Sequence, residues 1–131
     1  MSADPEALIL FAHGARDPGW RAPLDALAQR MRAVRPGGRV SVAFLELMAP
    51  SLGEAIDDAV AGGALRIAIA PVFWASGGHL KHDVPVLLEA ARARHPALRI
   101  ELWPALGESE AVLDAIAGAY ARLWESGAAT R

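Results

Sequence analysis

Two histidines, His13 and His79, lie in segments of the kind that often carry reactive side chains, just after predicted strands. His13 directly follows an apolar segment, and His79 follows Gly77 and Gly78, which allow the backbone to approach a ligand closely. Loops at strand ends frequently carry function. A neutral imidazole accepts protons and binds Fe²⁺, Co²⁺ or Ni²⁺. The pair therefore indicates proton transfer or metal binding, with a structural histidine and a plain glycine turn as the alternative interpretations.

Further ionisable residues lie near these two in the predicted fold. Glu46 follows the second predicted strand, either as a member of the site or as an ordinary surface carboxylate. His82 lies three residues after His79 and would share its face if that segment were helical, although a surface position is the commoner fate. Three basic residues nearby would take part in binding only if the ligand is anionic: Arg16, Arg21 and Lys81.

Apolar patterning predicts the elements that position these residues. Short apolar segments predict buried strands at 7–12, 40–45, 67–73 and 98–103. Three- and four-residue spacing predicts amphipathic helices at 24–34, 52–60, 84–94 and 112–124. Pro50 is expected in a first helical turn, with Ser51 and Glu54 forming a capping box. Pro71 is expected to end a strand or mark a bulge, and His95 to face solvent.

The regular alternation of strand and helix predicts an α/β fold. We expect a parallel four-stranded sheet with helices on both faces, three layers in all, formed by residues 1–131 as a single domain. Right-handed crossovers place every strand-to-helix loop along one edge of such a sheet. Ligands bind at that edge in open α/β sheets. The predicted fold therefore brings the two histidines and Glu46 to one edge.

Composition excludes several classes of site and partner. The chain of 131 residues has a net charge of −2, which gives no general electrostatic reason to bind nucleic acid. It contains no cysteine, which excludes disulfides, iron–sulfur clusters and thiol nucleophiles. The acidic first residues are unlike a signal peptide, and no apolar segment approaches the ~20 residues that span a bilayer. We expect a cytoplasmic protein without membrane contact.

Three segments of the chain resemble the CbiX/SirB family of class II chelatases. They are Phe11-Ala12-His13-Gly14-Ala15-Arg16-Asp17, then Ala43-Phe44-Leu45-Glu46 with Pro50-Ser51-Leu52, and finally the segment from Pro71 to Pro85 that contains Gly77-Gly78-His79-Leu80-Lys81-His82. They keep the family's order and spacing and extend over nearly the whole chain. One short motif would be weak evidence for the family, but three motifs in the family's order and spacing make the resemblance fairly specific.

The resemblance implies a fold, a reaction and a set of site residues. It implies one chelatase-like half domain, the short form of the family, which works as a homodimer. The expected reaction inserts a divalent metal ion, Co²⁺ first or else Fe²⁺ or Ni²⁺, into sirohydrochlorin for cobalamin or sirohaem biosynthesis, without an organic cofactor. His13 and His79 would bind the metal and move protons with Glu46. The acidic macrocycle would be held by Arg16, Lys81, His82 and Trp74.

Two other functions remain compatible with the residues. His13 could serve as the nucleophile of a phosphoryl-transfer enzyme, but histidine phosphatases place an arginine directly before the His-Gly pair, where this chain has Ala12. A carrier of metal or tetrapyrrole, or a regulatory module, could use the same fold without turnover. The last predicted helix and Trp124 could belong to an interface, although packing on the core is the commoner fate of such a helix.

Overall fold

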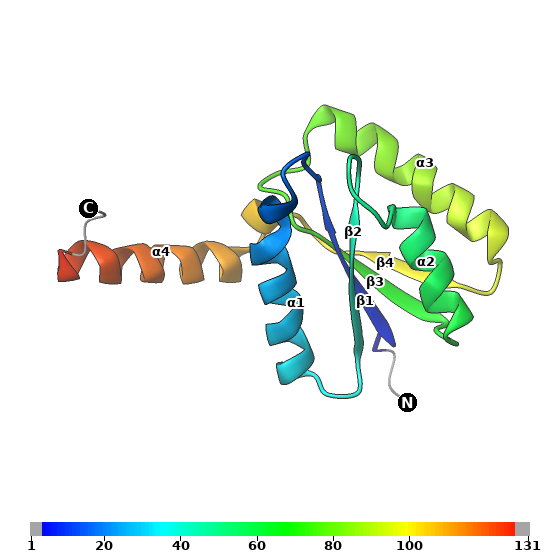
Figure 1. Ribbon diagram of the computed structural model, residues 1–131, viewed down its shortest axis with the longest axis horizontal. Coiled ribbons are helices and arrows are strands. Elements are labelled where there is room, and N and C mark those ends of the chain that lie inside the picture. Colours follow the sequence, from blue (N-terminus) through cyan, green and yellow to red (C-terminus); the bar gives the residue numbers. More distant parts are fainter. Residues whose placement is uncertain (1–3, 128–131) are drawn as a thin grey trace.

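The computed structural model describes residues 4–127, apart from the side chain of His79. One parallel sheet has the strand order β2-β1-β3-β4 (Figure 1). Its strands are β1 Ala7–Ala12, β2 Arg39–Phe44, β3 Arg66–Pro71 and β4 Arg99–Leu102. The α-helices are α1 Ala22–Val34, α2 Leu52–Ala61, α3 Gly78–Arg94 and α4 Glu110–Ser126, and the short 3-10 helices are η1 Pro18–Arg21 and η2 Leu106–Glu108. The predicted α/β fold with a four-stranded parallel sheet is confirmed.

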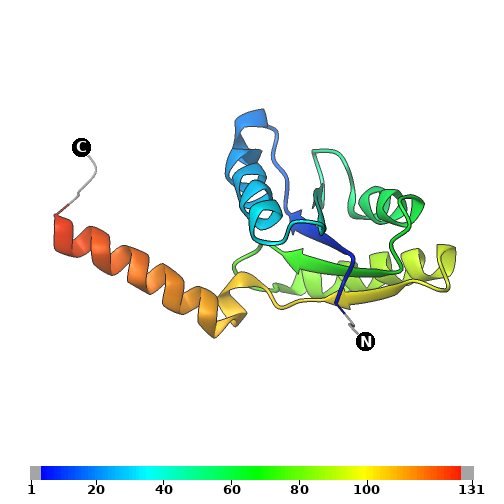
Figure 2. The ribbon, with the colours of Figure 1, turned by 90° about the horizontal axis from the view of Figure 1, so that it is seen from below.

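Helices cover both faces of the sheet, as predicted (Figures 1 and 2). Every residue of β1 is buried, which explains why its sequence is continuously apolar rather than alternating. On one face, Ile9 and Phe11 pack with α2 and α3 in the larger core cluster. On the other face, Leu8 and Leu10 pack with α1 in a smaller cluster. The central strand therefore holds the layers together and fixes where its own carboxyl end points.

The amino end of α2 is built by the predicted capping box. The Ser51 hydroxyl accepts a hydrogen bond from the Glu54 amide at 3.2 Å, and the Ser51 amide donates to the Glu54 carboxylate at 2.8 Å. Pro50 lies before this cap and not in the first helical turn, so that expectation is wrong. The Pro50 carbonyl instead accepts a bond from the Phe44 amide, which closes the loop between β2 and α2.

Replacing Ser51 by alanine is expected to lower the free energy of unfolding by about 1 kcal/mol, because one helical amide loses its acceptor. Urea denaturation followed by circular dichroism measures the change. Ser51→Asp is the control, because the aspartate carboxylate also caps a helix and interacts favourably with the positive end of the helix dipole. Equal losses in the two variants would contradict a capping role for the side chain.

Helix α3 begins earlier than the sequence pattern suggested. It starts at Gly78 instead of Val84, so His79 lies in its first turn and not in a loop, and Pro85 lies inside the helix. The glycine pair favours a turn in the sequence, but Gly77 is an extended N-cap residue, and its carbonyl accepts a hydrogen bond from the Lys81 amide at 2.9 Å. Glycine is acceptable at this position because the N-cap residue has a non-helical backbone conformation.

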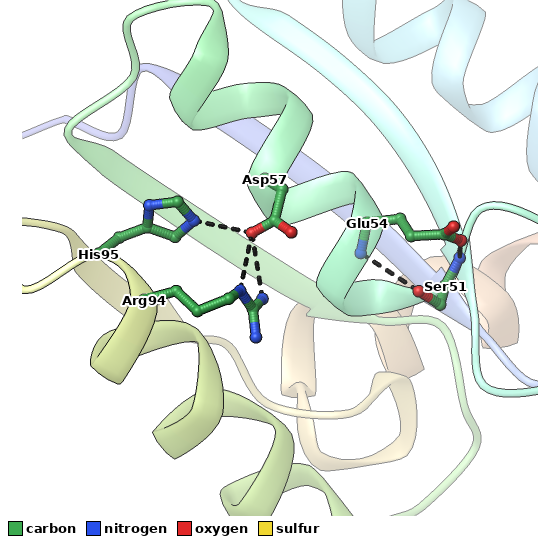
Figure 3. A network of polar contacts seen from close by, with 5 residues as sticks. All are labelled: Ser51, Glu54, Asp57, Arg94 and His95. Atoms are coloured by element: carbon green, nitrogen blue, oxygen red, sulfur yellow. Dashed lines mark hydrogen bonds and ion pairs between the residues drawn. The ribbon is translucent and has the colours of Figure 1, made fainter.

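The far end of α3 is tied to α2 through Asp57 (Figure 3). The Asp57 carboxylate lies 2.7 Å from Nε2 of His95 and accepts a hydrogen bond from Nε of Arg94 at 3.1 Å. His95 is thus half-buried against Asp57, and the expectation that it faces solvent is wrong. The bond from His95, followed by that from Arg94, lowers the pKa of Asp57. This cluster fixes the position of the helix that carries His79.

Replacing Asp57 by asparagine is expected to lower stability at neutral pH and to have little effect in acid. A carboxyl group whose pKa is lowered by folding stabilises the native state above its unfolded pKa, near 3.9, and this stabilisation is lost as the pH falls through the folded value. Urea denaturation of both proteins between pH 3 and pH 7 should therefore show the difference shrinking below about pH 4. A difference that stays constant over this range would contradict the assignment.

Helix α4 leaves the body of the molecule, which the sequence pattern did not indicate. It points away from the sheet in both views (Figures 1 and 2). None of its residues is buried, and Trp124 is 88% exposed. The commoner fate of such a helix, packing on the chain's own core, is therefore not what this one adopts. Within residues 4–127, no helix is long and apolar enough to cross a membrane.

Candidate functional site

The first site residue, His13, lies directly after β1 at the carboxyl edge of the sheet. Pairing between β1 and β2 continues past the ends of both strands, because the Leu45 amide donates to the Ala12 carbonyl at 2.9 Å and the Glu46 amide to the His13 carbonyl at 3.1 Å. Two backbone bonds therefore place Glu46 beside His13. The prediction that parallel strands bring these two residues to one edge is confirmed for this pair.

Gly14 allows the two loops to approach so closely. Its φ is +95°, a conformation that other residues rarely adopt. A Cβ atom built at this position would collide with the carbonyl oxygen of Glu46. Two constraints therefore favour glycine at position 14: the positive φ of its backbone and the lack of space for a side chain beside the Glu46 carbonyl.

The side chains of His13 and Glu46 face each other across this contact. Nε2 of His13 lies 3.7 Å from Oε2 of Glu46, and both side chains are about half-exposed, at 53% and 54%. Nδ1 of His13 lies 3.3 Å from the Gly14 carbonyl oxygen, which only accepts hydrogen bonds. A proton on Nδ1 satisfies that contact and leaves a lone pair on Nε2. An imidazole nitrogen and a carboxylate oxygen then point to one exposed place.

This pair is spaced suitably for a shared cation. First-row divalent ions bind imidazole nitrogen and carboxylate oxygen at about 2.1 Å, so ligands of one ion lie roughly 3 to 4 Å apart. The same pair can pass a proton, because a carboxylate beside an imidazole stabilises the imidazolium. Among the described side chains, no group of three or more His, Asp or Glu gathers for a metal.

Phe73 connects His13 to the third site segment. Its ring lies 6.2 Å from the His13 ring and 5.5 Å from the Phe11 ring, edge to face in both pairs. Phe73 also lines a mostly apolar cavity of about 240 Å³ at the start of α3. The cavity is lined by Phe11, Pro71, Phe73, Ser76, Leu80, Lys81, Val84, Pro85, Leu102, Trp103 and Glu108. An apolar surface thus continues from the histidine to α3.

The other predicted site residues differ in how they are placed relative to this apolar surface. The side chain of His79 lies outside the described part of the structure, although its backbone is in the first turn of α3. Lys81 lines the cavity and is exposed. His82, on the same turns of α3, is exposed, and so is Arg16 in the loop after β1. Trp74 is 62% exposed and offers a flat apolar surface to solvent.

Arg21 is not a free cation, contrary to its suggested use for an anionic ligand. Its guanidinium donates two hydrogen bonds to Asp25, at 3.0 and 3.1 Å. It also lies over the Phe44 ring, 4.9 Å from the centroid. The role of Arg21 is therefore to attach the start of α1 to the end of β2.

Two cavity residues, Trp103 and Glu108, were missed by the sequence analysis. Trp103 directly follows β4, so the rule that placed His13 and Glu46 at the carboxyl edge applies to it as well. The sequence pattern predicts a strand at 98–103, which includes Trp103, whereas β4 ends at Leu102 and leaves Trp103 just past the strand end. Glu108 belongs to η2, a short helix that has no periodic pattern to reveal it.

Comparison with known proteins agrees with this architecture. The CbiX family model matches residues 7–123. The chain belongs to the CbiX family. A sirohydrochlorin cobaltochelatase from Methanopyrus kandleri is 35% identical over 82 residues, which are 63% of this chain and 57% of the relative. The chain therefore matches somewhat more than half the length of this curated relative.

Two solved structures of CbiX-type proteins share the fold. A CbiX protein from Marinobacter aquaeolei VT8 is 29% identical with a TM-score of 0.80, and the match covers 92% of this chain and 98% of that chain. The sirohydrochlorin chelatase SirB from Bacillus subtilis subspecies spizizenii, in complex with cobalt, is 28% identical with a TM-score of 0.76. That match covers 91% of this chain but 50% of SirB. The family predicted from the three segments is confirmed.

Proposed function

We propose that this CbiX-family protein is a chelatase that inserts a divalent metal ion into sirohydrochlorin or a closely similar tetrapyrrole. The observation that carries the proposal is the pairing of His13 with Glu46 at the carboxyl edge, next to an apolar cavity. Cobalt is proposed as the metal, because the Methanopyrus relative is a cobaltochelatase and SirB was solved with cobalt. Fe²⁺ is the second candidate, which imidazole and carboxylate ligands accept as well.

The proposed reaction needs a weak metal site and a proton acceptor at the same place. The metal ion enters the macrocycle, and the two inner N–H protons leave as it binds the four ring nitrogens. His13 would hold the ion through Nε2 and then take up a released proton, with Glu46 as a second ligand and proton acceptor. His79, whose backbone lies in the first turn of α3, would supply the second imidazole. An open site with few protein ligands is suitable, because the ion must be transferred and not retained.

The residues around the pair suit an acidic aromatic ring system. Lys81, His82 and Arg16 are exposed and would bind the carboxylates of the macrocycle. Phe73 and Trp74 offer apolar surface to its face. The cavity of about 240 Å³ admits only the edge of a tetrapyrrole, so the ring would lie across the open carboxyl edge of the sheet.

The working unit is proposed to be a homodimer of single-domain chains. This chain matches half of SirB, so two copies together have about the length of one SirB chain. Residues 1–131 would act as one domain in each copy. A cytoplasmic location belongs to the same proposal, and cell fractionation tests it.

A chelatase assay decides between this proposal and its alternatives. The protein is incubated anaerobically with sirohydrochlorin and Co²⁺, Fe²⁺ or Ni²⁺ in turn, and metal insertion is followed by the change in the absorption spectrum. We expect catalytic turnover well above the protein-free rate, fastest with Co²⁺. Binding of sirohydrochlorin without turnover would indicate a carrier, and release of phosphate from a generic phosphomonoester would indicate a phosphatase. Either result would overturn the chelatase assignment.

A further inference from the structure

The loop between β2 and α2 holds one residue in an unfavourable backbone conformation. Within residues 4–127, Leu47 is the one residue other than glycine with a positive φ, at +66°. In this region Cβ comes too close to the following carbonyl oxygen, and leucine lacks the short polar side chain with which asparagine or aspartate compensates. At the other described positions with a positive φ the chain has glycine: Gly14, Gly37, Gly63 and Gly127. The presence of leucine at position 47 therefore needs a reason outside its own backbone.

The side chain of Leu47 does not supply that reason through the core. It is 57% exposed. Its neighbours differ, because Leu45 packs against the core cluster on the α2 and α3 side of the sheet and Met48 against the cluster on the α1 side. Leu47 belongs to neither cluster. An exposed apolar side chain on a strained backbone is unfavourable in both respects for the free protein.

Contacts before and after Leu47 maintain its conformation. The Glu46 amide donates to the His13 carbonyl at 3.1 Å, which ties the loop to the end of β1. The Phe44 amide donates to the Pro50 carbonyl at 2.9 Å, which closes the loop at its base. Backbone strain persists where the surrounding structure fixes it in this way, and it is concentrated at functional sites. The strain at Leu47 is therefore a reason to look for a function of its side chain.

Leu47 lies on one side of His13 along the carboxyl edge of the sheet, and Phe73 and Trp74 lie on the other. The strand order β2-β1-β3 determines this arrangement, because Leu47 comes shortly after β2, His13 directly after β1, and the two aromatic residues shortly after β3. Trp74 is exposed to a similar extent as Leu47, at 62%. Apolar residues thus flank the imidazole on both sides.

We propose that Leu47 is a binding residue for the tetrapyrrole, with its side chain against the face of the ring on the β2 side of His13, while Phe73 and Trp74 contact the ring on the β3 side. This inference rests on the proposed function, because it concerns the same site and the same substrate. A flat conjugated ring has apolar surface on its face, and contact with Leu47 removes apolar area of both partners from water. The exposure of this leucine is then relieved when the substrate binds.

Titration with metal-free sirohydrochlorin, followed by quenching of the protein's tryptophan fluorescence, tests the contact directly. Leu47→Asn is the decisive variant, because asparagine adopts a positive φ more readily than leucine but is polar. Loss of part of the transfer free energy of a leucine side chain should raise Kd about fivefold. Leu47→Met keeps an apolar side chain of similar volume and should bind within about twofold of wild type.

Leu65→Asn is the matched control for the titration. Leu65 is as exposed as Leu47, at 59%, so the same substitution changes a similar area of apolar surface. It directly precedes β3 and lies at the amino edge of the sheet, the edge opposite to His13. Its variant should bind sirohydrochlorin with the affinity of the wild-type protein.

Steady-state kinetics separate a binding contact from an indirect effect on Glu46. A binding contact predicts that Leu47→Asn raises KM for the tetrapyrrole about fivefold while kcat stays within about twofold of wild type. A displaced Glu46 would lower kcat and raise the metal concentration needed for half-maximal rate. The urea midpoint of Leu47→Asn should be no lower than that of wild type, because asparagine relieves part of the backbone strain.

Two results would overturn the role of Leu47 alone: an unchanged Kd in Leu47→Asn when the wild-type protein binds and metallates sirohydrochlorin, or a lower urea midpoint together with a lower kcat, which would make the side chain structural. A wild-type protein that does not bind sirohydrochlorin would overturn this inference and the proposed function together. Weaker binding by Leu47→Asn, with no metal insertion by the wild-type protein, would support the contact and overturn the chelatase reaction alone.

Discussion

Replacing His13 by alanine is expected to lower the rate of metal insertion by at least about a hundredfold, while tetrapyrrole binding stays within a few-fold of wild type. A positioned general base contributes typically 10²- to 10⁴-fold, and His13 is proposed to supply both this function and a metal ligand. The lone pair on Nε2, 3.7 Å from Glu46, is what alanine removes. The loss should therefore appear mainly in kcat.

His95→Gln is the matched control for this experiment. It also removes one imidazole from the chain, but His95 lies at the far end of α3 and contacts Asp57. Its variant should lose some stability and keep its chelatase rate within about twofold. His79→Ala should show a loss as large as that of His13→Ala if the two imidazoles act on the same ion. Full activity in either active-site variant would remove that histidine from the mechanism.

Glu46→Gln separates the two functions assigned to the pair. The amide keeps the size of the side chain and one oxygen, but it loses the negative charge and the ability to accept a proton at neutral pH. We expect a smaller loss than in His13→Ala, about tenfold, with a higher metal concentration needed for half-maximal rate. The backbone bonds that place residue 46 beside His13 are unaffected by the change.

Most of the fold was predictable because its signals are local. The buried strand at residues 7–12 and the capping box at Ser51 and Glu54 were read correctly from patterns a few residues long. The start of α3 was not, because glycine pairs are common in loops and nothing nearby marks Gly77 as an N-cap. The direction of α4 was not predictable either. An amphipathic pattern shows that a helix has one apolar face, but it does not show against which surface that face packs.

The candidate site was predictable only as a set of segments. The topology brings His13 and Glu46 to one edge, and that could be inferred from strand order alone. The separation of their side chains depends on the close approach at Gly14, which is a three-dimensional contact between two loops. The pairing of Arg21 with Asp25 also had a helical spacing that could have revealed it, four residues apart. Trp103 could not be placed in the same way as His13, because the predicted strand 98–103 includes it and the observed strand ends one residue earlier.

The contact at Gly14 leads to the second large effect expected of a single substitution. Gly14→Ala should lower the free energy of unfolding by roughly 2 to 5 kcal/mol, because alanine at a positive φ costs roughly 1 to 2 kcal/mol and overpacking against backbone adds 1 to 3 kcal/mol. The Cβ atom meets the Glu46 carbonyl, which is held by the loop and cannot rotate away as a side chain would. Urea denaturation measures the loss.

Gly37→Ala isolates the collision from the backbone effect. Gly37 has nearly the same φ, +93°, and a Cβ atom there meets nothing within 4 Å. Its variant should therefore lose only the roughly 1 to 2 kcal/mol of the backbone term. Because relief of the collision at Gly14 must move Glu46 away from His13, Gly14→Ala should also lower the chelatase rate at least tenfold under conditions where it is fully folded. Gly37→Ala should leave that rate unchanged. Equal stability losses in the two variants would show that the loops yield freely, and the close approach would then have no role in setting the site.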